Sequence, residues 1–301
     1  MNPLIKFMDA IHKELGNTPA ELPEGVIVRF DEPTAKAGNK NLWAVLNLAT
    51  DNPFGAYGSW REGTSFTWSN NSSGQNKLTP YQQREIKEQR LIAQRQRALE
   101  TAARNQAIAA KALSIWNKAV PANPNHPYIQ AKKLFSAGLA RQSRDCLILP
   151  MMTFDGEIKN LQFIYPNGDK RPLAGGQKQH CFIPVHLPSK PLSTFICEGW
   201  STGQTLADYH PRRRVIAAID AGNLNNVALA AANRWNEPIV ICGDDDRTNT
   251  ENRGKAVALA AAASIGASVC FPDFPSHAPL SLSDFNDWSV FIQQGGGNHA
   301  N

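Results

Sequence analysis

The sequence lacks the patterns that mark several common classes of protein. None of its five cysteines stands at the Cys-x-x-Cys spacing of a zinc finger or ribbon, so we expect reduced, buried thiols and no zinc site. The sequence shows no signal-peptide pattern, in which a basic start, an apolar core and a small-residue cleavage site follow one another. The longest apolar run, 256–271, is interrupted by Ser264, Gly266 and Ser268. We therefore expect a cytoplasmic protein without a membrane segment.

A nucleotide-binding P-loop is missing as well. A P-loop has the pattern Gly-x-x-x-x-Gly-Lys-Ser/Thr. Gly254-Lys255 matches its second glycine and its lysine, but Asn249 stands where the first glycine should be, and Ala256 stands where Ser or Thr should be. We therefore expect a chain that carries no NTP-driven motor of its own.

The composition is that of an ordinary globular protein, but the charge is concentrated in one segment. The 301 residues are 42% hydrophobic and 19% charged, and this length suffices for two domains. The formal net charge is +5, and residues 81–118 alone carry an excess of that size, because they hold three Glu and eight Lys or Arg. Such a segment is typical of a nucleic-acid contact, although a solvated spacer helix has the same composition.

The first two segments of the chain differ in character. Residues 1–75 combine short apolar runs with three tryptophans, which predicts a small, mostly β N-terminal module. Its aromatic residues suit either a base-stacking platform near Arg29 and Arg61 or, as we favour, the core of a small domain. Residues 76–120 predict a long basic helical linker with Thr79 as N-cap.

Two further segments follow, and then a tail. Residues 121–191 alternate a short helix with extended pieces and glycine-containing turns, which predicts an α+β subdomain rich in hairpins. Residues 192–292 alternate apolar strands with helices, which predicts a doubly wound parallel sheet of about four strands. The glycine-rich residues 293–301 are expected to form a flexible tail.

Carboxylates follow two of the predicted parallel strands. The run 194–197 stops at Glu198, and the run 239–242 leads to Asp244 and Asp246. Because ligands bind at the carboxyl ends of such strands, these side chains are expected to share one crevice. Clustered carboxylates repel one another, and a divalent cation is the usual compensation, so the pattern predicts a magnesium–phosphate site. Ordinary helix N-caps are the structural alternative.

These acidic motifs resemble a known family. Glu198-Gly199, Asp244-x-Asp246 and Asp284-Phe285-Asn286-Asp287 resemble the Toprim domain of bacterial primases, topoisomerases and some nucleases. Further segments resemble the primases of conjugative plasmids and satellite phages, namely His126-Pro127-Tyr128, Leu161-Gln162-Phe163-Ile164, Gly168-Asp169-Lys170-Arg171 and Ala221-Gly222-Asn223-Leu224. The resemblance extends from about Trp116 to Trp288 and implies a Toprim-like sheet.

The resemblance implies a role for each matching position. Glu198, Asp244 and Asp246 would be catalytic and would bind Mg²⁺ or Mn²⁺, and Asp284 or Asp287 would add to the acidic cluster. The basic side chains expected at nucleotide or template are Lys132, Lys133, Lys159, Lys170, Arg171, Arg84 and Arg90.

For the whole chain the resemblance implies a DNA primase, which makes short RNA primers on single-stranded DNA from ribonucleoside triphosphates. Many family members carry a zinc module or a helicase, and this sequence has the pattern of neither, so a separate replicative helicase is the expected partner. The same carboxylates would also serve a Toprim nuclease with water as nucleophile. A non-catalytic nucleic-acid-binding protein is the third alternative, and a topoisomerase is disfavoured.

Overall fold

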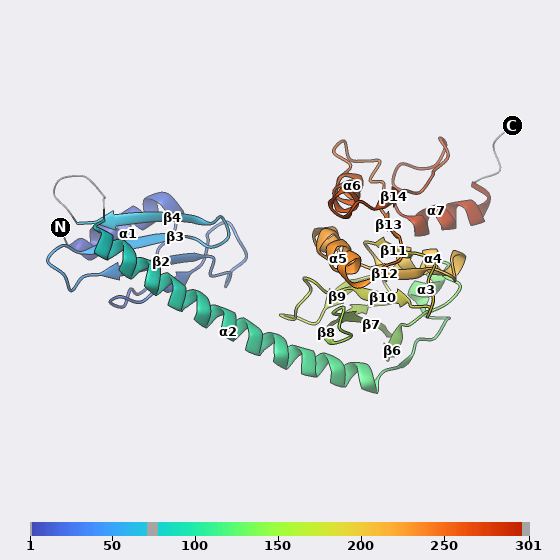
Figure 1. The fold of residues 1–301 in the computed structure, drawn as a ribbon, viewed down its shortest axis with the longest axis horizontal. Helices are drawn as coiled ribbons and strands as arrows, with labels where there is room; N and C mark the ends of the chain where they lie inside the picture. Colours follow the sequence, from blue (N-terminus) through green and yellow to red (C-terminus); the bar gives the residue numbers. More distant parts are fainter. Residues whose placement is uncertain (1, 71–77, 297–301) are drawn as a thin grey trace. The chain divides into compact units, whose positions relative to one another are not determined.

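The computed structural model describes residues 2–70 and 78–296 (Figure 1). The chain forms two compact units, Met1–Thr101 and Ala102–Asn301. Helix α2 (Pro80–Lys118) contributes to both units, because the boundary falls inside it. Residues 76–77 of the expected linker and 297–301 of the expected tail lie outside the described residues.

The N-terminal unit is an antiparallel sheet covered by one helix. Its strands pair in chain order and are β1 (Val28–Phe30), β2 (Leu42–Asn47), β3 (Phe54–Ser59) and β4 (Thr64–Ser69). Helix α1 (Pro3–Leu15) is capped by Asn2, whose Oδ1 accepts from the Leu4 N–H at 2.9 Å. Its apolar face buries Phe7 and Ile11 against the sheet. The mostly β module expected from the sequence is confirmed.

Most aromatic side chains of this unit are core residues. Trp43 is fully buried, and Phe7 packs against Tyr57 and Trp68 with ring centroids 5.7 and 5.2 Å apart. Phe66 is an exception, since it is 36% exposed while it stacks on Tyr57. The burial agrees with the interpretation as an aromatic core, because a base-stacking platform needs exposed ring faces.

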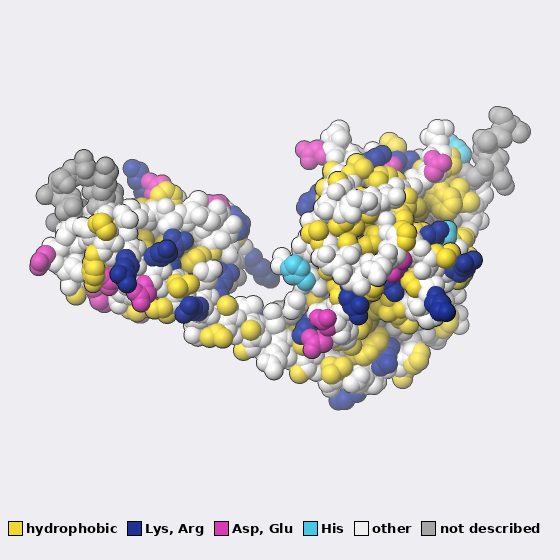
Figure 2. Space-filling view, viewed as in Figure 1, with side chains coloured by type: hydrophobic (Ala, Val, Ile, Leu, Met, Phe, Trp, Pro, Cys, Tyr) yellow, Lys and Arg dark blue, Asp and Glu magenta, His cyan; other side chains and the backbone are white. Residues whose placement is uncertain are grey.

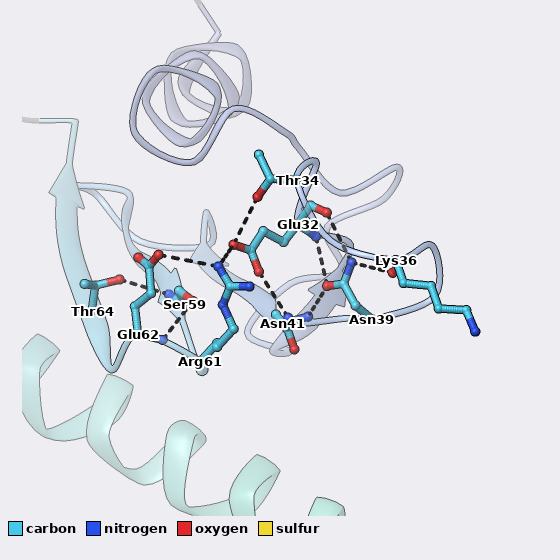
Figure 3. A network of polar contacts seen from close by, with 9 residues as sticks. All are labelled: Glu32, Thr34, Lys36, Asn39, Asn41, Ser59, Arg61, Glu62 and Thr64. Carbon is cyan, nitrogen blue, oxygen red and sulfur yellow. Dashed lines mark hydrogen bonds and ion pairs between the residues drawn. The ribbon is translucent and has the colours of Figure 1, made fainter. Parts of the chain in front are cut away.

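A buried carboxylate joins the loops at one end of this sheet (Figure 3). Glu32 is 8% exposed, forms an ion pair with Arg61 and accepts a hydrogen bond from Asn41 Nδ2 at 3.1 Å. Asn39 supports the same loop, because its Nδ2 donates to the Glu32 carbonyl and its Oδ1 accepts from the Glu32 N–H. The network therefore ties the β1–β2 loop to the β3–β4 turn.

Helix α2 begins with a reciprocal cap. The Gln82 N–H donates to Thr79 Oγ1 at 3.3 Å, and the Thr79 N–H donates to Gln82 Oε1 at 2.9 Å, which is the capping-box arrangement. The alanine-rich middle of the helix shows few charged side chains (Figure 2). Its last turns bury Ala112 against Ile148 and Leu161. The long basic helix predicted from the sequence is confirmed.

An antiparallel subdomain follows α2 in the chain. Its five-stranded sheet is built in chain order from β5 (Val120–Pro121), β6 (Arg141–Ser143), β7 (Cys146–Met152), β8 (Ile158–Ile164) and β9 (Lys170–Pro172). Helix α3 (Pro127–Ala131) lies between β5 and β6 in sequence. The hairpin turns at Gly156 and Gly168 have φ values of 88° and 89°, which favour glycine. The hairpin-rich α+β character is as predicted.

The third sheet contains the four predicted parallel strands. They are β11 (Thr194–Cys197), β12 (Arg214–Ala217), β13 (Ile239–Cys242) and β14 (Ser268–Cys270), and they lie in the order β12-β11-β13-β14. A fifth strand, β10 (Ile183–His186), pairs antiparallel with β12 at the edge. The sequence pattern did not place this strand in the parallel sheet.

Helices cover both faces of the parallel sheet. Helices α5 (Ala221–Arg234) and α6 (Arg253–Ile265) pack on one face, where Val227 and Ala258 join the same apolar cluster as Ile196. Helix α4 (Trp200–Tyr209) packs on the other face, beside α7 (Phe285–Phe291). The segment Ile292–Gly296 follows α7 and has a left-handed φ of 89° at Gly295. Trp200 shares a core with Leu147 of β7, so the second and third sheets pack as one body. None of the described helices is long and apolar enough to span a bilayer.

Replacing Glu32 by Gln should destabilise the N-terminal unit. The change removes the charge that pairs with Arg61, and we expect the free energy of unfolding to fall by about 1–2 kcal/mol. Glu62→Gln is the matched control, because Glu62 is exposed and lies 3.8 Å from the same guanidinium. Its effect should stay below about 0.5 kcal/mol. Urea unfolding measures both, and equal losses would contradict the interpretation.

Candidate active site

Two neighbouring parallel strands end at the same level of the sheet and are followed by carboxylates. The register pairs Cys197, the last residue of β11, with Cys242, the last residue of β13. Glu198 follows the first strand directly, and Asp244 follows the second after one glycine. This edge is where open α/β sheets bind ligands.

Asp244 lies at the centre of a cluster of five carboxylates. Burial, together with the charges of Asp284, Glu198, Asp246 and Asp287, raises the pKa of Asp244 to about 8. Its Oδ1 atom is buried and has no hydrogen-bond partner among the described residues. Leaving a buried carboxylate oxygen unpaired is unfavourable, so this atom is an acceptor for a cation or a proton.

Glu198 contacts the beginning of a helix. Burial and the charge of Asp246 raise the pKa of Glu198, whereas the backbone N–H of Ala221 and the charge of Lys170 oppose that rise. Ala221 is the first residue of α5, so the N-terminal end of this helix donates to the carboxylate.

Asp246 is held by the first turn of α6. Its Oδ2 accepts a hydrogen bond from the Gly254 N–H at 2.9 Å, and its own N–H donates to Asn252 Oδ1 at 3.0 Å. A Cβ atom at position 254 would stand 2.9 Å from the same Oδ2 and 3.0 Å from the Asp244 carbonyl oxygen, which explains the glycine. The N-cap of α6 is Asn252, so the N-cap interpretation of Asp246 is wrong, and Asp246 accepts from the first turn of the helix while it belongs to the cluster.

Asp284 and Asp287 are already engaged by the protein. Asp284 caps α7, because its Oδ1 accepts from the Asp287 N–H at 2.7 Å, and its Oδ2 accepts from Thr202 Oγ1 at 3.0 Å. Asp287 accepts from the Ser283 N–H at 3.2 Å and lies 3.5 Å from Lys132 Nζ. Burial lowers the pKa of Lys132, but the charges of Asp284 and Asp287 outweigh it, so the pKa is raised overall.

The donor chemistry of the cluster fits a hard divalent cation. All five groups are carboxylates, the ligands that Mg²⁺ and Mn²⁺ prefer, and Asp244 contributes an unpartnered oxygen. Within residues 2–70 and 78–296 no three His, Cys, Asp or Glu side chains stand in positions that could hold a metal ion. Binding a cation therefore requires these side chains to adjust.

The predicted basic residues differ in their relation to this cluster. Lys170 acts on Glu198 electrostatically, and its Nζ lies 5.9 Å from the centre of the Tyr128 ring. Lys132 touches the cluster through Asp287. The neighbouring Arg171 is exposed and pairs with Asp169 at 3.2 Å.

The remaining predicted basic residues are not brought to the cluster by any described contact. Lys159 pairs with Glu157 at 2.6 Å, and Lys133 is exposed with a φ of 48°. Arg84 and Arg90 belong to the N-terminal unit. Arg84 is exposed, whereas the guanidinium of Arg90 lies 4.9 Å from the centre of the Trp43 ring.

A second basic pattern on α2 was not singled out from the sequence. Three exposed basic residues of α2 are spaced seven residues apart, namely Arg104, Lys111 and Lys118. This spacing returns to the same side of a helix, so they form a stripe along one face. No Asp or Glu occurs between Glu100 and Asp145. Both features are present in the sequence, as a seven-residue repeat of basic residues within a segment that has no acidic residue.

The chain is similar to known proteins in its last third and over a longer range. Residues 193–297 match the family model described as Toprim domain. Two Escherichia coli proteins named DNA primase TraC are similar over a longer range. One is 30% identical over 225 residues, which cover 71% of this chain and 15% of the relative. The other is 29% identical over 281 residues, which cover 90% of this chain and 26% of the relative.

The chain thus spans about a quarter or less of the length of these curated relatives. Among solved structures, the primase fragment of the bacteriophage T7 primase-helicase protein is similar over 56% of this chain and 66% of that chain. The TM-score is 0.40 and the sequence identity 13%, which do not by themselves establish a shared fold.

Asp244→Asn should stabilise the cation-free protein, and more so at high pH. Asp244 has a pKa of about 8 in the folded chain against an ordinary value of 3.8. Between about pH 4 and pH 8 the unfolded chain releases this proton while the folded chain keeps it, so stability falls as the pH rises. We expect the gain in Tm from the substitution to be larger at pH 8 than at pH 5 by about 5 °C.

Thermal unfolding in a chelator measures this difference. Asp155→Asn is the control, because Asp155 is exposed in a hairpin turn and should show no pH-dependent gain. An equal gain in Tm at both pH values for Asp244→Asn would contradict a raised pKa at Asp244.

Proposed function

We propose that the chain is a DNA primase, a nucleotidyltransferase that joins ribonucleotides into short RNA primers on single-stranded DNA. The observation that carries this proposal is the buried Asp244 carboxylate, which four other acids surround and which keeps an unpartnered oxygen at the strand ends of a Toprim domain. The similarity of most of the chain to proteins named DNA primase supports the same function.

The proposed reaction is attack of a 3′ hydroxyl on the α-phosphorus of a ribonucleoside triphosphate. A new O–P bond forms as the bond between the α-phosphorus and the bridging oxygen to the β-phosphate breaks, and pyrophosphate leaves. Mg²⁺ or Mn²⁺, when bound, supplies charge neutralisation and lowers the pKa of the attacking hydroxyl. The protein itself would position the carboxylates that bind the cation and the basic side chains that bind the phosphates.

The three carboxylates predicted to be catalytic divide this task. Glu198 and Asp246 accept from the N-terminal ends of α5 and α6, and after the adjustment that cation binding requires they would hold the cation together with Asp244. Asp244 offers the unpartnered oxygen. Asp284 and Asp287 add negative charge, but their hydrogen bonds to Thr202 and Ser283 make them supporting groups.

The basic residues are proposed to bind phosphates. The charge of Lys170 lowers the pKa of Glu198, which supports a role for Lys170 in binding the triphosphate. The stripe formed by Arg104, Lys111 and Lys118 lies in a stretch without acids, which suits the backbone of a single-stranded template. The partners of this function are single-stranded DNA, ribonucleoside triphosphates and a separate replicative helicase.

Primer synthesis is the direct test. The chain, incubated with single-stranded DNA, labelled ribonucleotides and Mg²⁺ or Mn²⁺, should produce template-dependent short RNAs. Asp244→Asn should reduce the rate by about 1000-fold or more, because the site loses a central charged ligand. Asp155→Asn, a charge change of the same size in an exposed turn, should leave the rate unchanged. Shortened DNA without added nucleotides would instead indicate a nuclease, and neither product would indicate a binding protein.

Lys170 and Arg171 form a matched pair for testing phosphate contacts. Lys170→Ala should raise the KM for ribonucleotides by about tenfold, the effect of losing about 1.4 kcal/mol of binding. Arg171→Ala should change it by less than about twofold, because its guanidinium pairs with Asp169 and no described contact brings it to the acidic cluster. Steady-state kinetics on one template compares them, and equal effects would remove Lys170 from the proposed site.

A further inference from the structure

A small cavity lies where the antiparallel subdomain meets the Toprim domain. Its volume is about 420 Å³, near the small end of the range for ligand sites, which suits a single nucleoside. Tyr128 and the turn Pro166–Gly168 line it from the antiparallel subdomain. Pro279, Leu282 and Phe291 line it from the Toprim domain.

The lining matches a flat ring with polar edges. Tyr128, Leu282 and Phe291 offer apolar surface, and the amide side chains of Asn286 and Asn167 offer hydrogen bonds. Nucleobases combine these two features, and unpaired bases bind proteins by stacking and through their edges.

One amide at this cavity has an unused acceptor. Asn286 is only 1% exposed, and its Nδ2 donates to the Lys132 carbonyl at 2.7 Å and to Thr205 Oγ1 at 2.9 Å. Its Oδ1 has no partner among the described residues. A buried amide oxygen without a donor is unfavourable, so an amino group on a ligand would stabilise the site.

The cavity adjoins the acidic cluster. Lys132 and Asp287 line the cavity, and their ion pair also forms the edge of the cluster. The Nζ–Oδ1 distance of 3.5 Å leaves the Lys132 ammonium available to an incoming phosphate. A nucleoside in the cavity would therefore have its phosphate at Lys132, next to the acids around Asp244.

Two nucleic-acid components could supply such a nucleoside, the template strand or a free ribonucleotide. During copying, the base of the incoming nucleotide must pair with the template, so its pairing edge cannot bind protein at the same time. A base whose amino group donates to Asn286 Oδ1 has that edge occupied. An uncopied template base next to the paired positions is free to bind in this way, which favours the template.

We infer that this cavity receives one unpaired base of the single-stranded template and thereby sets the position at which synthesis starts. The inference rests on the proposed primase function. It assigns Tyr128, Asn286 and Leu282 to template recognition rather than to the chemical step.

The test places a fluorescent base at known distances from the site. A short RNA annealed to the template fixes the register, and 2-aminopurine is scanned over the neighbouring unpaired template positions. Ala131→Trp fills the cavity from its exposed rim without removing a contact. Ala103→Trp is the matched control, since Ala103 is an exposed helical alanine outside the cavity lining.

We expect emission to change on binding at one template position in the wild-type chain and in Ala103→Trp. Ala131→Trp should abolish that change and weaken binding of the same template by about tenfold, the effect of losing one stacked base. The same variant should also spread the RNA start sites over more template positions. Emission changes that are equal at all positions, or unaffected by Ala131→Trp, would overturn the inference.

Two further outcomes distinguish a template base from a nucleotide base in the cavity, and distinguish the cavity proposal from the proposed primase function. If Ala131→Trp raises the KM for one ribonucleotide and leaves the template signal unchanged, the occupant is a nucleotide base and the template assignment is overturned. If the position-dependent signal is present and is lost in Ala131→Trp, but the chain makes no RNA, the cavity is supported and the primase function fails.

Discussion

The repulsion among five carboxylates is the constraint on which the rest of the structure depends. Burial, and then that repulsion, raise the pKa of Asp244, and helix ends offset part of the repulsion. Helix α5 donates an N–H to Glu198, α6 donates one to Asp246, and α7 is capped by Asp284. Three helix N-termini thus direct their partial positive charge at the cluster, while the central oxygen of Asp244 is left without a partner.

The same constraint links the Toprim domain to the antiparallel subdomain. Lys132, which comes from the end of α3, pairs with Asp287, and its carbonyl accepts from Asn286 in α7. The two sheets share an apolar core, so these polar contacts lie on a rigid base. The acidic cluster and the cavity beside it are therefore products of one packed body, in which one side supplies most of the negative charge and the other supplies the lysines.

The sequence predicted the parallel sheet and the strand-end acids because both depend on local patterns. Apolar runs that stop at Glu198 and Asp244 are visible in any window of a few residues. It did not place β10 in the parallel sheet, because an isolated apolar run does not reveal its pairing partner. The hydrogen bond from Thr202 to Asp284 and the contact between Lys132 and Asp287 join distant parts of the chain, and only tertiary packing defines them.

The register between β11 and β13 has a consequence for folding itself. Glu198 and Asp244 become neighbours only when Cys197 and Cys242 pair across strands that are far apart in sequence. The extended chain therefore offers a cation three separate acidic segments, whereas the folded chain brings them into one cluster. A cation that prefers the cluster stabilises the fold by mass action. The lifetime of the folded chain against proteolysis would then depend on cation concentration before any nucleotide is bound.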